Sequence, residues 1–428
     1  MRAKLTKMFQ SLQVRNYRLF LTGQLVKLIG VWMMFIAQDW LVLQLSDDSA
    51  TALGVVVALQ FTPVLLFTLL SGRLADRYDK RLLLVAANGA YSVLALGMSL
   101  LVLTGLVELW HVFVFAALLG VANAVETPVR QAFVSELVGT TLLPNALSLS
   151  AATFNTARIF GPAVAGVAIA AFDVGPVFLI SALSSAAPVV GLLQMRANEL
   201  YREAPPQVGD RAAVRVVDGL RYVFRRSDLL LPMGLMAVIG MTLFNFQLTL
   251  AALAKTVFDT GAESFGLFTT ALAVGSLGGA LAGSGRRARP SVWVVLGAAI
   301  GAAGFGTLVG LAPTYWLVAA LLVPSGFFMV FFAQAANQRV QLGVDAAFRG
   351  RVMALWVLVF LGTNPIGAPI VGWVAETFGA GASIWSGGLI SLATAGTALI
   401  WQLRRTGTRL RLRVLPSPRL YVVPTTHS

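Results

Sequence analysis

The 428-residue sequence contains no cysteine and only two histidines, His111 and His427. Disulfides and thiolate metal sites are therefore excluded, and neither a histidine-based metal site nor a histidine-containing catalytic triad can be assembled. No lysine follows a glycine anywhere in the chain, so a phosphate-binding loop of the GxxxxGK type is absent as well. We expect no cofactor, no resident metal and no enzymatic activity.

Charged residues are also scarce, at 12% of the chain, whereas 57% of the residues are hydrophobic. The apolar residues fall into blocks of about 20 residues or more, each long enough to cross a ~30 Å hydrocarbon core as a helix. Within lipid every backbone N–H and C=O has to be satisfied internally, so these blocks are predicted to be helices. The twelve blocks cover residues 17–45, 50–73, 81–104, 110–131, 146–172, 175–195, 230–254, 262–284, 290–312, 314–336, 351–375 and 380–403.

The net charge of +14 follows from topology and does not indicate a nucleic-acid partner. With the N-terminus placed in the cytoplasm, 29 of the 32 lysines and arginines fall on the cytoplasmic side. The opposite loops carry the acids Asp47, Asp48, Glu108, Asp173, Asp259, Glu263 and Glu376. We therefore expect a multi-pass protein of a bacterial plasma membrane, the inner membrane, with both termini cytoplasmic. The first span is expected to stay in the mature protein, because it is too long for a signal peptide.

A central loop divides the spans six and six. We predict an N-terminal six-helix bundle (1–195), a linker (196–229), a C-terminal bundle (230–403) and a basic cytoplasmic tail (404–428). Part of the linker is amphipathic when it is wound as a helix, with Val216, Val217, Leu220, Val223 and Phe224 on one side and Arg211, Arg215, Arg225 and Arg226 on the other. This pattern predicts a helix lying on the anionic inner leaflet. A structural brace is favoured over a regulatory element.

The two halves show a weak internal repeat. A shift of 206 residues superposes Gly161 and Gly166, in "GPAVAG", on Gly367 and Gly372, in "GAPIVG". Two halves in the same orientation imply a pseudo-twofold axis along the membrane normal, with a path between them. The Gly161-Pro162 and Gly367-Pro369 segments are predicted points of helix flexure or of close helix packing.

The loop between spans 2 and 3 reads "SGRLADRYDKRLLLV". It resembles the cytoplasmic loop signature of the major facilitator superfamily, G-x-L-A-D-R-x-G-R-[KR], although Asp79 stands where the family usually has Gly. The matching residues are Gly72, Leu74, Ala75, Asp76, Arg77, Lys80 and Arg81. "RNYRLFLTGQLV", "AQDWLVLQL", "VETPVRQAFVSELV", "NTARIFGPAVAG" and "FRGRVMALW" resemble the exporter branch that includes enterobactin and macrolide efflux proteins.

The resemblance implies a twelve-helix all-α membrane fold made of two pseudo-symmetric six-helix bundles. In that fold Asp76 would face the N-terminus of span 11, where a carboxylate is favoured by about 0.3–1 kcal/mol. Arg77, Lys80 and Arg81 are expected to reach Glu126 at the inner end of span 4. Such contacts would make the loop a cytoplasmic latch.

Four charged residues lie well inside the spans: Lys27, Asp39, Glu126 and Arg158. An isolated charge at the bilayer centre costs at least ~2.5–3.5 kcal/mol, so each needs a partner or water. We expect Glu126 to pair with Arg158 or Arg130. Two interpretations stay open for these charges: a carboxylate cycles a proton between the two sides, or the ion pairs only fix helix packing. Packing or a latch is favoured for Glu126 and function for Lys27, Asp39 is undecided, and Arg158 is expected to line a cavity.

Amides supply most of the remaining polar groups within the spans. On span 1, Gln24, Lys27 and Gln38 share one side of the helix, which is predicted to face a cavity or another helix. Aromatic and amide residues in the C-terminal half suit a bulky, mostly apolar ligand. The substrate-cavity candidates are Gln24, Gln38, Asn123, Asn155, Asn245, Gln247, Gln334, Asn337 and Asn364.

These observations predict a monomeric secondary transporter that exports small amphiphilic molecules of the drug, macrolide or siderophore type. The expected mechanism is proton antiport with alternating access. Two alternatives stay open, namely an importer or uniporter of a small metabolite, and a membrane sensor or scaffold that transports nothing.

Overall fold

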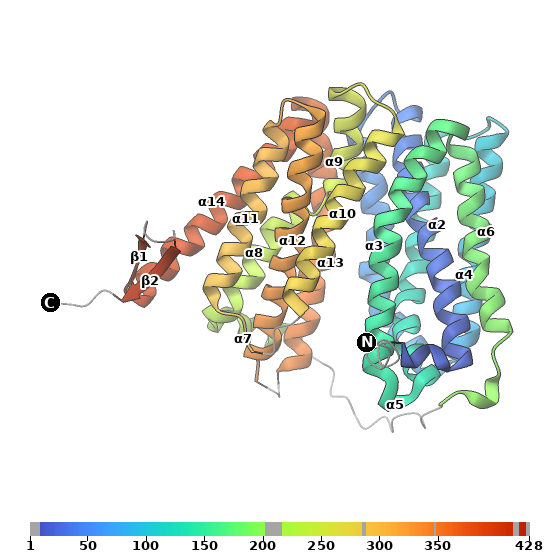
Figure 1. Ribbon diagram of the computed structural model, residues 1–428, viewed down its shortest axis with the longest axis horizontal. Coiled ribbons are helices and arrows are strands. Elements are labelled where there is room, and N and C mark those ends of the chain that lie inside the picture. The colour runs from blue at the N-terminus through green and yellow to red at the C-terminus, as the bar shows by residue number, and fades with distance from the viewer. Residues whose placement is uncertain (1–8, 202–215, 285–287, 346–347, 414–418, 425–428) are drawn as a thin grey trace.

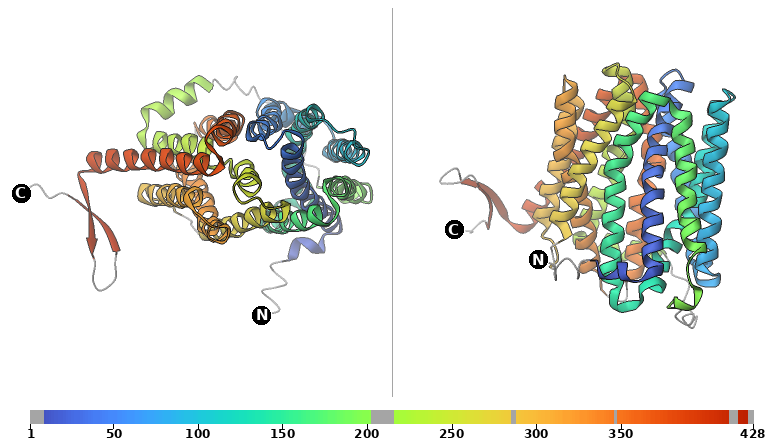
Figure 2. Two further views of the ribbon diagram at one scale, coloured as in Figure 1. Left: turned by 90° about the horizontal axis from the view of Figure 1, so that it is seen from above. Right: turned by 45° about the vertical axis from the view of Figure 1, so that its right-hand side comes forward.

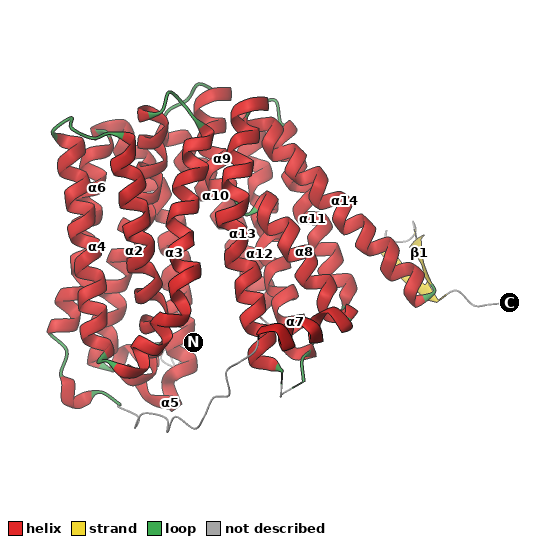
Figure 3. Cartoon of the chain, turned by 180° about the vertical axis from the view of Figure 1, so that it is seen from behind, coloured by secondary structure: helices red, strands yellow, loops and turns green. Residues whose placement is uncertain are grey.

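The computed structural model describes residues 9–201, 216–284, 288–345, 348–413 and 419–424. Their side chains are described as well, except those of residues 68–73, 75, 76, 216–218, 408–413 and 419–424. Helices dominate these residues (Figure 3). In the described part of the chain, eleven helices are long and apolar enough to cross a membrane. One of them crosses twice, so the predicted twelve-helix, all-α fold is confirmed.

The N-terminal bundle follows a short 3-10 helix, η1 (Gln10–Gln13). Its long helices are α2 (Arg15–Leu45), α3 (Ala50–Arg77), α4 (Lys80–Leu103), α5 (Leu109–Phe172) and α6 (Val174–Leu193), and a 3-10 turn, η2 (Ala197–Glu199), follows. Asp79 has φ −61°, and its side chain caps α4 by accepting from the backbone N–H groups of Arg81 and Leu82. The turn therefore needs no left-handed residue where the family usually has Gly.

Helix α5 contains both predicted spans 4 and 5. At 64 residues a straight helix would be roughly 96 Å long, about three times the thickness of a hydrocarbon core. Gly139 breaks it with φ 66° and ψ 178°, a conformation that a residue with a Cβ adopts only at a cost. The chain reverses within α5, at the lower end of the bundle in Figure 1. The predicted loop between the two spans is thus helical on both sides of one glycine.

The C-terminal bundle begins with an interrupted span. Helix α8 (Ser227–Leu243) ends before Asn245, and α9 (Phe246–Ala252) continues into a π-helical turn, η3 (Leu253–Val257). The remaining helices are α10 (Ala262–Ser284), α11 (Val292–Leu311), α12 (Tyr315–Gly343), α13 (Arg349–Phe378) and α14 (Ala380–Thr406). The sequence did not predict the hairpin that follows α14, in which β1 (Thr408–Arg413) pairs antiparallel with β2 (Arg419–Pro424).

Successive spans run in opposite directions (Figure 1), so the predicted loop charges gather at the two ends of the spans. We call the end that carries Arg15, Arg77 and Lys80 the basic end. The end that carries Asp47, Asp48, Glu108, Asp173, Asp259, Glu263 and Glu376 is the acidic end. Figure 2 shows the two bundles side by side, with the amphipathic helix α7 at the edge of the C-terminal one.

The superposed glycines make equivalent contacts in the two bundles. Gly161 and Gly367 each pack on the first helix of their own bundle. A Cβ added at Gly161 would lie 2.4 Å from the Cβ of Trp32, and one added at Gly367 would lie 2.5 Å from the Met241 carbonyl oxygen. Gly166 and Gly372 instead pack against the other bundle. A Cβ added at Gly166 would lie 2.9 Å from the Ala262 carbonyl oxygen, and one added at Gly372 would lie 2.4 Å from the Ala50 carbonyl oxygen. The sequence repeat is therefore a repeat of packing geometry. Flexure at Gly161-Pro162 and Gly367-Pro369 stays a prediction.

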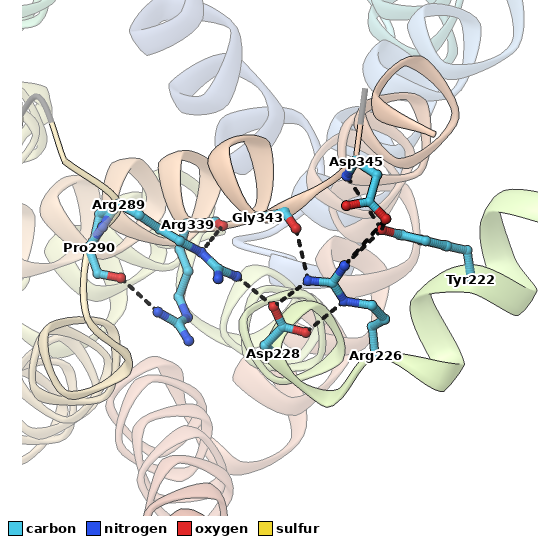
Figure 4. Close-up of polar contacts among 8 residues, drawn as sticks. All are labelled: Tyr222, Arg226, Asp228, Arg289, Pro290, Arg339, Gly343 and Asp345. Atoms are coloured by element: carbon cyan, nitrogen blue, oxygen red, sulfur yellow. Dashed lines mark hydrogen bonds and ion pairs between the residues drawn. The ribbon is translucent and has the colours of Figure 1, made fainter. Parts of the chain in front are cut away.

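Helix α7 (Val216–Arg225) follows the linker and braces the C-terminal bundle. Its Gly219 packs on Arg351 of α13, and the Tyr222 hydroxyl donates to the Asp345 carboxylate at 2.7 Å. Arg226 forms an ion pair with Asp228 at 3.0 Å and donates to the Gly343 carbonyl, as Figure 4 shows. Leu220 and Phe224 are exposed on α7, as expected for a helix that lies against a membrane surface.

Candidate functional site

A cavity of about 650 Å³ lies between the two bundles. Among the described residues of the N-terminal bundle, Trp32 of α2 and Phe154 and Arg158 of α5 line its wall. The C-terminal bundle contributes the rest of the described wall, from the break that follows α8 and from helices α9, α10, α12 and α13. The wall is mainly apolar, and its aromatic and thioether residues are Trp32, Phe154, Phe244, Phe246, Met329, Met353, Trp356 and Phe360. Its size and apolar surface are those of a small-molecule site.

Arg158 supplies the charge of this cavity, as predicted. Its guanidinium donates to the Ser276 hydroxyl on α10 at 3.0 Å and lies 5.9 Å from the centre of the Trp32 ring. Trp32, Phe154 and Ser276 were not predicted as site residues. Phe154 lies one helical turn before Arg158, a spacing that puts both on one face of α5 and could have indicated it.

Three of the predicted cavity amides line the wall: Gln247, Gln334 and Asn337. The other six are not part of the lining: Gln24, Gln38, Asn123, Asn155, Asn245 and Asn364. Gln24 and Gln38 are buried inside the N-terminal bundle, at 3% and 1% exposure. Asn155 donates to the Ala151 carbonyl and Asn245 donates to the Met241 carbonyl, each about one helical turn earlier in the sequence. Polarity within a span therefore did not suffice to identify a lining residue.

Asp39 lies where the two bundles meet, on the acidic side of the cavity. Its side chain is 2% exposed and accepts a hydrogen bond from the Gln247 amide at 2.9 Å. Because Gln247 lines the cavity, this bond links a buried carboxylate of one bundle to the cavity wall of the other. The sequence placed Asp39 inside a span but did not predict its partner.

Lys27 and Glu126 form an ion pair inside the N-terminal bundle. The lysine Nζ lies 3.1 Å from a carboxylate oxygen of Glu126, and the two side chains are 4% and 7% exposed. Arg130 contacts the same carboxylate at 3.2 Å, and the Tyr91 ring lies 5.4 Å from the lysine Nζ. The predicted pairing of Glu126 with Arg130 is confirmed, the alternative pairing with Arg158 is wrong, and the pairing with Lys27 was not predicted.

The loop signature makes contacts within its own bundle. Lys80 pairs with Glu136, and Arg81 donates to the carbonyls of Leu192 and Leu193 at 2.7 and 3.1 Å. The expected contacts of Lys80 and Arg81 with Glu126 are therefore wrong for this conformation, because nearer acceptors at the basic end engage both side chains. The Arg77 guanidinium lies 5.9 Å from the centre of the Tyr78 ring. Gly72 and Asp76 belong to α3, but the contacts predicted for this stretch lie outside the described side chains.

Polar contacts join the two bundles at the acidic end. Glu376 of α13 accepts from the Ser49 hydroxyl at 2.6 Å and from the Thr51 backbone N–H at 2.8 Å. Lys255 of η3 forms an ion pair with Asp48. Among the described residues, the hydrogen bonds and ion pairs between the bundles lie at the cavity or between it and the acidic end.

Two six-helix bundles with a largely apolar cavity between them form the fold of the major facilitator type. The structure is similar to a POT family transporter, with a TM-score of 0.72 at 12% identity, covering 92% of this chain and 97% of that one. It is also similar to the D-xylose-proton symporter, with a TM-score of 0.65 at 16% identity over 89% and 96% of the two chains. These likenesses show the fold.

The sequence model described as the transmembrane secretion effector family matches residues 6–420, and the chain belongs to that family. It is 28% identical to the staphyloferrin A transporter of Staphylococcus aureus over 60% of this chain and 64% of the relative, just under two thirds of the relative's length. It is 24% identical to the enterobactin exporter EntS of Escherichia coli over 85% of this chain and 86% of the relative. The predicted superfamily and exporter branch are confirmed.

Proposed function

We propose that this protein exports small amphiphilic molecules of the drug, macrolide or siderophore type from the bacterial cytoplasm in exchange for protons. The observation that carries the proposal is the cavity between the bundles: among the described residues, the hydrogen bonds and ion pairs that join the bundles lie at this cavity or on its acidic side. The lining extends to Asn337 and Met353, within two turns of the basic ends of α12 and α13. By the positive-inside rule the basic end is cytoplasmic. The cavity is then accessible from the cytoplasm and closed toward the outside.

Two further observations support export by proton exchange. Asp39 provides a buried carboxylate at the bundle interface, hydrogen-bonded to the cavity wall through Gln247. Such intramembrane carboxylates are typical of proton relays in transporters. The similarity to enterobactin exporters supports the outward direction.

Transport in proteoliposomes tests the function. The purified protein is reconstituted, the membrane potential is clamped, and uptake of erythromycin, ethidium and an iron-free siderophore is measured. With an acidic lumen, a proton antiporter accumulates its substrate as protons leave, and an uncoupler abolishes the accumulation. Accumulation that requires an alkaline lumen would indicate symport and import. Absence of flux for every compound under both gradients would support a scaffold.

Alternating access predicts that the acidic end has to open once in every cycle. Because the chain has no cysteine, a Thr51→Cys, Glu376→Cys variant carries only the two introduced thiols, in residues whose backbone N–H and carboxylate lie 2.8 Å apart. We expect a short bifunctional methanethiosulfonate to block flux in this variant, and a reductant to restore it. Each single-cysteine variant, treated in the same way, controls for the reagent. Undiminished flux through the cross-linked protein would contradict the rocking mechanism.

A further inference from the structure

The charge balance of the cavity indicates which ligand it accepts. Arg158 is the one charged residue among the described residues that line it. Its guanidinium forms no ion pair with any described carboxylate, and its hydrogen bond goes to a neutral hydroxyl, that of Ser276. The Ser276 hydroxyl in turn donates to the Leu272 carbonyl at 2.8 Å, which fixes its oxygen as an acceptor for Arg158. The cavity wall therefore carries one unneutralised positive charge.

Asp39 is the carboxylate to consider as a counter-ion. It hydrogen-bonds to the lining residue Gln247 but does not line the cavity itself, and it makes no ion pair with Arg158. The other buried carboxylate of the N-terminal bundle, Glu126, is already shared by Lys27 and Arg130. Neither acid neutralises the guanidinium within the cavity.

A guanidinium has five N–H donors in a planar fork, which matches the two oxygens of a carboxylate or a similar oxyanion. Among the described residues, Ser276 alone accepts a hydrogen bond from Arg158. The remaining donors are available to a ligand. Because the cavity is lined by apolar groups, a charge-assisted hydrogen bond made there is stronger than in water.

The apolar part of the ligand is indicated by the wall around this charge. Trp32 and Phe154 flank Arg158 on the N-terminal side, and Phe244, Trp356 and Phe360 belong to the opposite bundle. Aromatic side chains pack well on flat rings, and the thioethers of Met329 and Met353 adapt to irregular shapes. The wall therefore suits an aromatic body.

Resting on the proposed transport function, we propose that the substrate is an organic anion with an aromatic body, and that Arg158 binds its oxyanion group. Cationic amphiphiles are disfavoured, because no carboxylate among the described lining residues can act as their counter-ion. An inside-negative membrane potential adds to the export of such an anion, by roughly 2.3 kcal/mol per charge at 100 mV.

Binding of two matched probes tests the inference without requiring transport. 4-Phenylbenzoate and 4-phenylbenzamide have nearly the same shape and differ in charge. We expect the full-length protein in neutral detergent to bind the benzoate at least about tenfold more tightly than the benzamide in isothermal titration calorimetry. Arg158→Gln is expected to lose this preference while still binding the benzamide, which shows that its cavity is intact. Arg158→Lys should retain part of the preference, because it keeps the charge and loses the fork.

Arg405→Gln is the matched control, since it removes the same charge from an exposed position near the end of α14. It should bind both probes like the unmodified protein. Equal affinity for the two probes, no binding of the benzoate, or a preference that survives in Arg158→Gln would overturn the inference. Gradient-driven flux in vesicles is measured separately and does not depend on these binding results. Failure of the charge preference and failure of the transport function are therefore distinguishable.

Discussion

Replacing Glu126 by Gln is expected to destabilise the protein by about 3–5 kcal/mol, the usual cost of removing one partner from a buried ion pair. The substitution preserves shape and removes the charge that Lys27 and Arg130 share at 3.1 and 3.2 Å. Lys27, whose side chain is 4% exposed, is then left without a carboxylate. A lowered midpoint of thermal unfolding, followed by intrinsic tryptophan fluorescence in detergent, would measure the loss.

Lys27→Met is the informative control. It leaves Glu126 paired with Arg130, so we expect a smaller loss of stability than for Glu126→Gln. The double variant Lys27→Met, Glu126→Gln should recover much of the loss, because the buried lysine charge is removed together with its partner. If the double variant is no more stable than Glu126→Gln alone, an unpaired Lys27 is not the cause of the destabilisation.

These placements change the interpretation of Lys27. The sequence favoured a functional role, because a lysine deep in a polar stripe indicates a transport path. In the structure the lysine belongs to the interior of the N-terminal bundle, beside Tyr91 and Gln24, and is not part of the cavity lining. Both polar atoms of the Gln24 amide are buried without a hydrogen-bond partner in the described structure. We therefore propose a packing role for Lys27 and Glu126.

The spans could be predicted because hydrophobic length and the positive-inside pattern are local properties. The Glu126–Arg130 pair could be predicted too, since residues four apart on a helix are neighbours. The Lys27–Glu126 and Asp39–Gln247 contacts could not, because they join helices whose rotation about their axes is fixed only by packing. Helical periodicity places Gln24 and Lys27 on one side of α2 but does not say whether that side faces the cavity or the helices α4 and α5.

The loop signature illustrates a different limit. Charge and spacing predicted that Lys80 and Arg81 would reach Glu126, whereas Glu136 and the carbonyls at the end of α6 engage them. A flexible basic side chain has several acceptors within reach, and the sequence does not rank them. Conversely, Asp79 departs from the family pattern without disturbing the turn, because an aspartate at this position is also a good helix N-cap.

Asp39→Asn is expected to abolish accumulation driven by a pH gradient while leaving exchange of substrate across the membrane intact. For one proton exchanged per substrate at a clamped potential, a gradient of one pH unit sustains about tenfold accumulation of a neutral compound. The variant should equilibrate the compound without concentrating it. Accumulation and counterflow, measured in the same proteoliposomes, separate the two effects. Asp48→Asn, at the acidic end and paired with Lys255, is the matched control and should still accumulate substrate.

The physical reason lies in the bond between Asp39 and Gln247, which ties α2 to α9 across the bundles. A hydrogen bond to an ionised carboxylate is roughly twice as strong as one between neutral groups, so protonation of Asp39 weakens the tie. A ligand that hydrogen-bonds to the Gln247 amide in the cavity weakens this contact as well.

The empty, unprotonated carrier keeps the acidic end closed, and either a proton or a substrate allows it to open. An exchanger requires this behaviour, because its unloaded form must not change sides. Asparagine accepts only the weaker, neutral hydrogen bond, so the empty Asp39→Asn carrier can change sides as the protonated aspartate form does, but it carries no proton. Accumulation that persists in Asp39→Asn would place the coupling proton on another residue.

Gln247→Leu removes the hydrogen bond to Asp39 and keeps the carboxylate. We therefore expect this variant to leak both substrate and protons, whereas Asp39→Asn is expected to leak substrate alone.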